Sequence, residues 1–490
     1  MARTGQAAGA GRGDLGKREL GKRELVKREF DKRELGKREF DKLQGELNRF
    51  LSETKIFVAG DQKLARMESL VAALGNPQNQ VPAVHIAGTS GKTSTVYFAA
   101  EFLKNEGFKV GLSVSPHIED VRERAQINGE KLPYPEYNRY LAEFYGLVRE
   151  SGILPSYFEF YMAFFYWLAA RLELDYIIVE VGMGGLHDGS NVISNPGKIC
   201  VITDIGLDHI EILGSSLVEI AEQKAGIIKP GNTVFMYRQA PEVVEVVEAK
   251  CAAMGSWLTV LEDIGFKDFQ ERNANLAWQA VRTATSAPEL PLSAANVKVP
   301  ARAEELSYMG KKVVLDGAHN PQKLRAFVDY AKPRFAGGLG GDGAGGGAGS
   351  GKAILVASFG ANKAAALEEN FKILHELGDY VLLASFQDKS IETNFRESLP
   401  FDVMEAAARS AGFKGVGIAG GAKSALIQAA ERAGQVGADY IIVVGSFFLA
   451  SDARRVITRG DDGADEDVSE GRIDEDGVVE DGNEGGEVGA

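Results

Sequence analysis

The 490-residue chain has two cysteines, three tryptophans and no long apolar run. Cys200 and Cys251 cannot build a disulfide framework or a four-cysteine zinc site, so we expect two buried thiols. The longest apolar stretch, residues 160–170, is far shorter than the ~20 residues that cross a bilayer. The N-terminus also lacks the apolar region of a signal peptide. We therefore expect a cytosolic protein without a membrane partner.

The net charge of −14 is unevenly distributed along the chain. Residues 461–490 hold 13 acidic residues and one arginine, whereas residues 1–50 hold 14 basic and 9 acidic residues. The part between them is only mildly acidic. It lacks the basic stripe that is typical of nucleic-acid-binding proteins, so we expect no nucleic-acid partner.

Three segments have biased composition. Residues 16–40 repeat GKREL, GKREL, VKREF, DKREL and GKREF, and this period advances about 500° on a helix, so its apolar residues form no stripe. We predict that residues 1–45 form a basic appendage without a core; an arm that touches nucleic acid or membrane is the alternative. Residues 337–351 contain ten glycines and predict a flexible insertion. Residues 461–490 predict a disordered acidic tail.

Between these segments, short apolar runs alternate with helical stretches, which predicts parallel sheets covered on both faces. We expect an α/β protein with a P-loop mononucleotide-binding domain at residues 46–296 and a smaller Rossmann-like α/β domain at residues 297–460. The expected strands are residues 81–87, 110–115, 176–181, 199–205 and 233–237, followed by 312–315, 353–357, 380–384 and 440–444.

A glycine-rich loop lies between the first expected strand and an expected helix at residues 95–105. Glycines let backbone amides approach a phosphate chain, and a lysine adds a point charge. A hydroxyl next to that lysine suits Mg²⁺. A chance glycine-rich turn is the alternative, but the strand, loop and helix occur in the order that ATP binding requires. The predicted ATP site is Gly88, Thr89, Ser90, Gly91, Lys92, Thr93 and Ser94.

Eight ordered segments resemble the Mur ligase superfamily and, within it, folylpolyglutamate synthase and dihydrofolate synthase. They are LGNPQ (74–78), HIAGTSGKTST (85–95), SPHI (115–118), YFEF (157–160), VEVGMGG (179–185), LDHIEILG (207–214), IAEQKAGIIKPG (220–231) and LDGAHNP (315–321). The chain departs from the folate pattern at Thr93 and Ala301, where glycine is usual, and at Leu186 and His187.

Glu180 and His209 follow the carboxyl ends of expected strands, where open α/β sheets bind ligands. The resemblance implies that Mg²⁺ is held by Thr93, Ser94, Ser115, Glu180, His209 and Lys224, and that K⁺ is a further candidate cation. It also implies that Lys224 is carbamylated, which needs an uncharged amine. A surface lysine paired with an acid is the alternative.

The resemblance extends to the second domain and to the substrate. It implies that Arg302, Asp316 and His319 bind ATP from across the cleft, while Asn273 contacts the adenine side. Arginine suits this role because its planar fork spans phosphate oxygens. The implied substrate-binding residues are Phe158, Glu159 and Asp188, although core packing explains most aromatic residues of that segment.

The resemblance implies a monomeric ATP-dependent amide ligase that adds L-glutamate to folate or dihydropteroate. The acid would form an acyl phosphate with ATP, which the glutamate amine then attacks. The implied catalytic residues are Lys92, Glu180, His209 and Lys224. Two alternatives remain open: another Mur-type amide ligase with a different acceptor acid, and a nonenzymatic ATP-binding scaffold.

Overall fold

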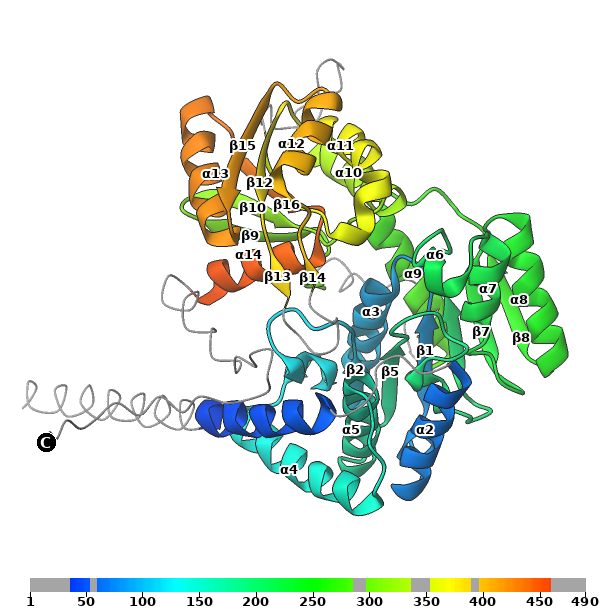
Figure 1. The fold of residues 1–490 in the computed structure, drawn as a ribbon. Helices are drawn as coiled ribbons and strands as arrows, with labels where there is room; N and C mark the ends of the chain where they lie inside the picture. Colours follow the sequence, from blue (N-terminus) through cyan, green and yellow to red (C-terminus); the bar gives the residue numbers. More distant parts are fainter. Residues whose placement is uncertain (1–35, 53–59, 285–296, 336–352, 389–395, 460–490) are drawn as a thin grey trace, which may run out of the picture.

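The computed structural model describes residues 36–52, 60–284, 297–335, 353–388 and 396–459. The predicted insertion at 337–351, the predicted tail at 461–490 and residues 1–35 of the predicted appendage lie outside these residues. The described chain forms two α/β bodies, each built around its own sheet (Figure 1). We call residues 36–284 the first lobe and residues 297–459 the second lobe.

The first lobe contains an eight-stranded sheet in the order β4-β3-β2-β5-β1-β6-β7-β8. Neighbouring strands from β2 to β8 run parallel, and β3 and β4 add an antiparallel edge. All five residues of β1 are buried, as expected for a central strand with helices on both faces. The strands are β1 (Ala83–Ala87), β2 (Val110–Ser113), β3 (Gln126–Ile127), β4 (Glu130–Lys131), β5 (Tyr176–Glu180), β6 (Ile199–Ile202), β7 (Thr233–Tyr237) and β8 (Trp257–Leu261).

Helices cover this sheet on both sides (Figure 1). Val84 and Ile86 of β1 pack with α3 (Lys92–Asn105) and α9 (Phe269–Val281) on one face. Ala83 and Ala87 point to the other face. The helices on that side are α2 (Gly60–Ala73), α5 (Tyr157–Arg171), α7 (Leu217–Ala225) and α8 (Pro241–Met254), with α4 (Tyr134–Ser151) packed on α5 and the short α6 (Ile210–Leu213) before α7.

The second lobe contains a six-stranded sheet in the order β15-β12-β11-β16-β10-β9, parallel except for β9. A two-stranded ribbon, β13 and β14, adjoins it. These strands are β9 (Glu304–Tyr308), β10 (Lys311–Leu315), β11 (Ala353–Ala357), β12 (Tyr380–Ala384), β13 (Gln387–Asp388), β14 (Arg396–Glu397), β15 (Gly415–Gly420) and β16 (Tyr440–Val444).

Two apolar cores lie on the two faces of the second sheet. One contains α10 (Pro321–Phe335), α11 (Leu367–His375) and α12 (Phe401–Ser410), and the other contains α13 (Ala422–Val436) and α14 (Phe447–Arg459). The predicted α/β fold class is therefore confirmed. Sequence analysis missed β8, β9 and β15, because each lies at a sheet edge and lacks a continuous apolar run. It also missed the two-residue strands β3, β4, β13 and β14, which are too short to show a pattern.

Residues 36–52 form a helix that packs on the first lobe, which corrects the prediction that no core forms before residue 45. Phe40, Leu47 and Leu51 are buried in the same core as α4 and α5, and the Phe40 ring lies 5.1 Å from that of Tyr134. The five-residue period ends at Phe40. Leu43, Leu47 and Leu51 then follow at spacings of three and four residues, which makes one apolar face.

We expect Leu47→Ala to lower the free energy of unfolding by about 2 to 5 kcal/mol, because Leu47 is fully buried and its loss leaves a cavity. Urea titration of the purified protein measures this change. The exposed neighbour Glu46 provides the control, and Glu46→Ala should change stability by less than about 0.5 kcal/mol. Equal stability of the two variants would show that the helix contributes no core.

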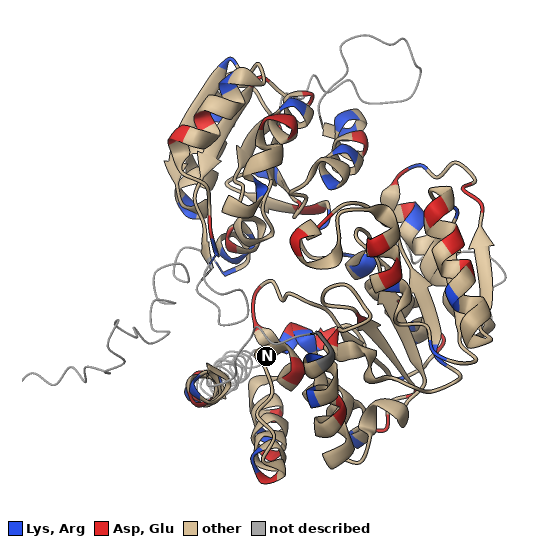
Figure 2. Cartoon of the chain, turned by 45° about the vertical axis from the view of Figure 1, so that its right-hand side comes forward, with Lys and Arg blue, Asp and Glu red and all other residues tan. Residues whose placement is uncertain are grey.

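Basic and acidic residues are interspersed on the outer helices of both lobes (Figure 2). Charged residues of both signs also lie where the two lobes meet, and these form the contacts analysed below. In the part of the chain that the structure describes, every helix is too short or too polar to cross a membrane.

Candidate active site

The P-loop runs from the end of β1 to the start of α3. Its two glycines are required by close contacts: a Cβ at Gly88 would lie 1.8 Å from Oγ1 of Thr203, and a Cβ at Gly91 would lie 2.6 Å from Oδ1 of Asn273. Gly91 precedes α3 without a capping side chain. The amides of the first helical turn and the helix dipole are therefore directed into the loop, where they favour a phosphate.

Thr89 and Ser90 fix the loop to the end of β6. Their backbone amides donate to the Asp204 carbonyl at 2.8 and 3.2 Å, and Oγ1 of Thr89 donates to the Gly206 carbonyl at 3.0 Å. If the Thr89 or Ser90 amide bound a phosphate, it would give up its hydrogen bond to the Asp204 carbonyl. The helix α3 begins at Lys92, three residues earlier than predicted, so Lys92, Thr93 and Ser94 lie in its first turn.

Two lysine side chains contact the same carbonyl of the loop. The Nζ atoms of Lys92 and Lys224 each donate to the Gly88 carbonyl at 2.9 Å. Lys224 comes from α7 and is only 4% exposed. Burial, and secondarily the charge of Lys92, lowers the pKa of Lys224 to about 7. The alternative of a solvated surface lysine is therefore wrong.

Glu180 joins the P-loop to the segment after β2. Oγ1 of Thr93 donates to one carboxylate oxygen of Glu180 at 3.0 Å, and the Ser115 amide donates to the other at 3.3 Å. Burial raises the pKa of Glu180, while Lys92 opposes that shift. Among the residues that the structure describes, the buried Ser115 hydroxyl oxygen has no hydrogen-bond partner. This set of oxygen atoms, with one of them unsatisfied, fits a hard divalent cation.

His209 lies at the start of α6 with a left-handed backbone, φ 50°. Burial lowers the pKa of its imidazole, which favours the neutral form that a metal ligand needs. Within the described residues, no hydrogen bond links this imidazole to Glu180, Thr93 or Ser115. The structure thus gathers three of the predicted metal ligands and leaves the role of His209 a prediction.

The second lobe sends Arg302 to the loop. Its Nη2 atom lies 3.5 Å from Oγ1 of Thr93, and its guanidinium lies 5.4 Å from the centre of the Phe447 ring. Ala301 and Ala303 on either side both have φ of 50°, a left-handed conformation that disfavours residues with a Cβ. The departure from glycine at Ala301 thus falls at a strained position.

Asp316 supports this arginine segment. Its carboxylate accepts hydrogen bonds from the amides of Ala303 and Ala318, both at 2.7 Å, and burial raises its pKa to about 6. His319 makes a 2.8 Å contact between Nδ1 and the Gly317 carbonyl. The structure therefore gives both residues a role in shaping the turn after β10, and ATP contact by either stays a prediction.

Sequence analysis missed a charged cluster between the lobes. Asp208 of the first lobe accepts from Lys323 at 2.8 Å, from Lys363 at 3.0 Å and from Asn320 at 3.3 Å, all from the second lobe. Although burial opposes the shift, Lys323, His319 and Lys363 hold the pKa of Asp208 well below its usual range. Asp208 stands in the LDH motif, but no sequence pattern marks the two lysines.

The predicted substrate residues differ in their surroundings. The Phe158 ring lies against Gly182, where an added Cβ would come within 2.7 Å of it. It also lines a small pocket that includes Ser115, Arg124 and Tyr161. The pocket also contains Ser113, Val114 and Met162.

Two of the predicted substrate residues already have protein partners. The Asp188 carboxylate accepts from the amides of Met183 and Ser190, both at 2.9 Å. The Glu159 carboxylate accepts two hydrogen bonds from Arg66, at 2.7 and 2.9 Å, and one from the Ser156 amide at the start of α5. Glu159 therefore positions α5, and its substrate contact stays a prediction.

Comparisons with known proteins agree with this geometry. No protein-family model matches the chain. Folylpolyglutamate synthase of Lacticaseibacillus casei is 32% identical over 323 residues, which cover 56% of this chain and 73% of that protein. Dihydrofolate synthase/folylpolyglutamate synthase of Bacillus subtilis (strain 168) is 31% identical over 315 residues, with the same two shares, 56% and 73%. A solved structure of Mycobacterium tuberculosis folylpolyglutamate synthase with ADP and AMPPCP has a TM-score of 0.68 at 25% identity and covers 82% of this chain and 97% of that one.

A P-loop lobe joined to a second α/β lobe that sends an arginine to the loop defines a nucleotide-dependent ligase of the Mur type. With identities of 32% and 31% over 73% of two curated relatives, the chain belongs to the folylpolyglutamate synthase and dihydrofolate synthase family. It is an ATP-dependent ligase of that family, which confirms the function inferred from the sequence motifs.

Proposed function

We propose that this enzyme joins L-glutamate to a folate-type carboxylate beside the P-loop. The observation that carries this proposal is the approach of Lys92 and Arg302 to the loop from two lobes. The acceptor is the benzoate of dihydropteroate or the γ-carboxylate of a folate glutamate. Its oxygen attacks the γ-phosphate of ATP, an acyl phosphate forms and ADP leaves. The glutamate amine then attacks the acyl carbon, and phosphate leaves as the amide forms.

The protein's part in this reaction is to position the reactants and to neutralise charge. Lys92 lies in the first turn of α3 and Arg302 reaches the neighbouring Thr93, so we place the γ-phosphate beside both cations. Two fixed positive groups stabilise the negative charge that develops during phosphoryl transfer. No side-chain nucleophile is required, because the acceptor carboxylate attacks directly. Asn273, beside Gly91, would contact the adenine side.

The residues around Glu180 suit a bound Mg²⁺. Thr93, Ser115 and Glu180 supply oxygen atoms, and no residue in the described part of the chain pairs with the Ser115 hydroxyl. Ser94 and His209 complete the proposed set. Such an ion, when bound, neutralises phosphate charge. A carbamate on Lys224 would add an anion, and a K⁺ ion is a further candidate cofactor. Phe158, next to Gly182, is the proposed contact of the acceptor's ring.

An ADP-release assay tests this function. We also propose that the protein is a cytosolic monomer. In the assay, the protein is incubated with ATP, Mg²⁺ and either dihydropteroate or tetrahydrofolate, each with and without glutamate. We expect ADP release that requires both the acid and glutamate, and none from a cell-wall precursor acid. Release with only that precursor would identify a different Mur-type ligase. A protein that binds ATP but turns over no acid would be a scaffold.

A further inference from the structure

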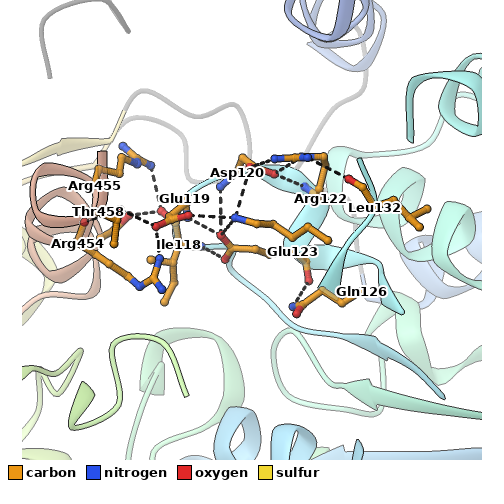
Figure 3. A network of polar contacts seen from close by, with 12 residues as sticks. Ile118, Glu119, Asp120, Arg122, Glu123, Gln126, Leu132, Arg454, Arg455 and Thr458 are labelled. Carbon is orange, nitrogen blue, oxygen red and sulfur yellow. Dashed lines mark hydrogen bonds and ion pairs between the residues drawn. The ribbon is translucent and has the colours of Figure 1, made fainter. Parts of the chain in front are cut away.

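A polar network joins the segment after β2 to α14 of the second lobe (Figure 3). The Ile118 carbonyl accepts hydrogen bonds from Oγ of Ser451 and, at 3.2 Å, from Nη2 of Arg455. Oγ1 of Thr458 donates to the Glu119 carboxylate at 3.0 Å. The two lobes are therefore held together at Ile118 and Glu119, on the far side of the P-loop from the Asp208 cluster.

Arg454 is the centre of this network, because it contacts carboxylates of both lobes. Its Nε atom lies 3.0 Å from both carboxylate oxygens of Glu304 in β9, and its Nη1 atom bonds to Glu119 of the first lobe. The side chains of Arg454, Glu119 and Glu304 are 19%, 13% and 4% exposed. Water screens these partly buried charges less than it screens a surface ion pair. Loss of Arg454 would leave the carboxylates of Glu119 and Glu304 without the cation that they share.

Glu119 is also fixed within its own lobe. Nζ of Lys131 lies 3.0 Å from the Glu119 carboxylate and 3.6 Å from that of Asp120. Although burial opposes the shift, Lys131 and Arg454 lower the pKa of Glu119. The Glu119 carboxylate is therefore ionised at neutral pH and held in place by Lys131. Through its contact with Arg454, it fixes the position of α14 relative to the first lobe.

The Glu304 end of the Glu119-Arg454-Glu304 bridge contacts the backbone beside Arg302, and the Glu119 end lies in the same segment as Ser115. Glu304 accepts a hydrogen bond from the Ala301 amide at 3.0 Å, directly before Arg302. Glu119 lies four residues after Ser115, whose amide donates to Glu180. A displacement of either carboxylate would therefore shift a residue on the corresponding side of the nucleotide.

We propose that Arg454 is a positioning residue that sets Arg302 and Ser115 at their working separation across the nucleotide. The test of this inference by kcat/KM rests on the proposed function, whereas the test by AMPPCP binding does not. The side-chain hydrogen bonds of Arg454 go to Glu304 and Glu119, so it would act on the site through them. Its role is to hold the segment of Arg302 against the segment of Ser115, so that both lobes contribute to one site.

Arg454→Ala tests this proposal in the full-length protein. We expect kcat/KM for ATP to fall at least tenfold and the Kd for AMPPCP to rise at least fivefold at 25 °C, while KM for the folate acceptor changes less than twofold. Arg454→Lys should recover part of this loss, since an ammonium group reaches one carboxylate only. Arg409→Ala is the matched control: Arg409 forms an exposed ion pair with Glu405 within α12, at 2.6 Å, and should change neither quantity.

Glu119→Gln is the second variant, because it keeps the shape of the side chain and decides the question if Arg454→Ala does not fold. It should weaken AMPPCP binding in the same direction, and its effect should not add to that of Arg454→Ala in the double variant. A lower melting temperature with unchanged AMPPCP affinity and unchanged kcat/KM would overturn the proposal and leave a structural bridge only. If the wild type turns over no folate acid, the proposed function fails, while the AMPPCP comparison still decides the role of Arg454.

Discussion

Replacing Lys92 with alanine should lower the rate of ADP release by about a hundredfold or more while the protein stays folded. The lysine lies in the first turn of α3 with its amine beside the Gly88 carbonyl, where the terminal phosphates of ATP would lie. Its loss removes a positive charge that acts on the transferred phosphoryl group. It removes no apolar core contact, so we expect a melting temperature close to that of the wild type.

Lys104 provides the control for this prediction. It lies in the last turn of the same helix, its side chain is 40% exposed, and it pairs with Glu101 at 3.2 Å. Lys104→Ala should therefore retain the wild-type rate, because an exposed ion pair contributes only about 0 to 1 kcal/mol and lies far from the loop. Wild-type turnover in Lys92→Ala, with a normal melting curve, would refute the assignment of the P-loop.

The central part of the site could be predicted from sequence because parallel strands bring their carboxyl ends to one edge. Glu180 ends β5 and the P-loop follows β1, and these strands are neighbours in the sheet. A short polar motif after an apolar run therefore predicts that its side chains lie at the carboxyl edge of the sheet, where ligands bind. Arg302 required the family resemblance, because only the packing of the lobes brings it to Thr93.

The features that sequence analysis missed depend on contacts between distant segments. The contacts of the Glu159 carboxylate with Arg66 and with the start of α5 were not predicted, and its substrate contact stays a prediction. The Asp208 cluster and the Arg454 bridge join residues that lie more than a hundred positions apart. Charged residues of this kind carry no periodicity, so a single sequence gives no sign of their partners.

Lys224 differs from an ordinary lysine in its charge at neutral pH. With a pKa of about 7, about half of its amine is neutral at pH 7, whereas an exposed lysine with a pKa of about 10.4 is almost wholly protonated. In the proposed carbamylation, the neutral amine would attack the carbon of CO₂, forming a C–N bond and releasing one proton to give the carbamate. Carbamylation should therefore increase as the pH rises through about 7, and bicarbonate-dependent activity should increase with it.

The second large effect is expected for Lys224→Ala, which should lose at least a hundredfold in rate because it removes the anion that the proposed carbamate would supply. A small carboxylate at high concentration should restore part of the rate. Lys224→Glu should restore less, since its carboxylate sits on a shorter stem. Mass spectrometry after gentle trapping should find the added carboxylate on Lys224 and not on Lys250 of α8, and Lys250→Ala should keep the wild-type rate. A Lys224→Ala enzyme whose kcat equals that of the wild type at every bicarbonate concentration would exclude the carbamate.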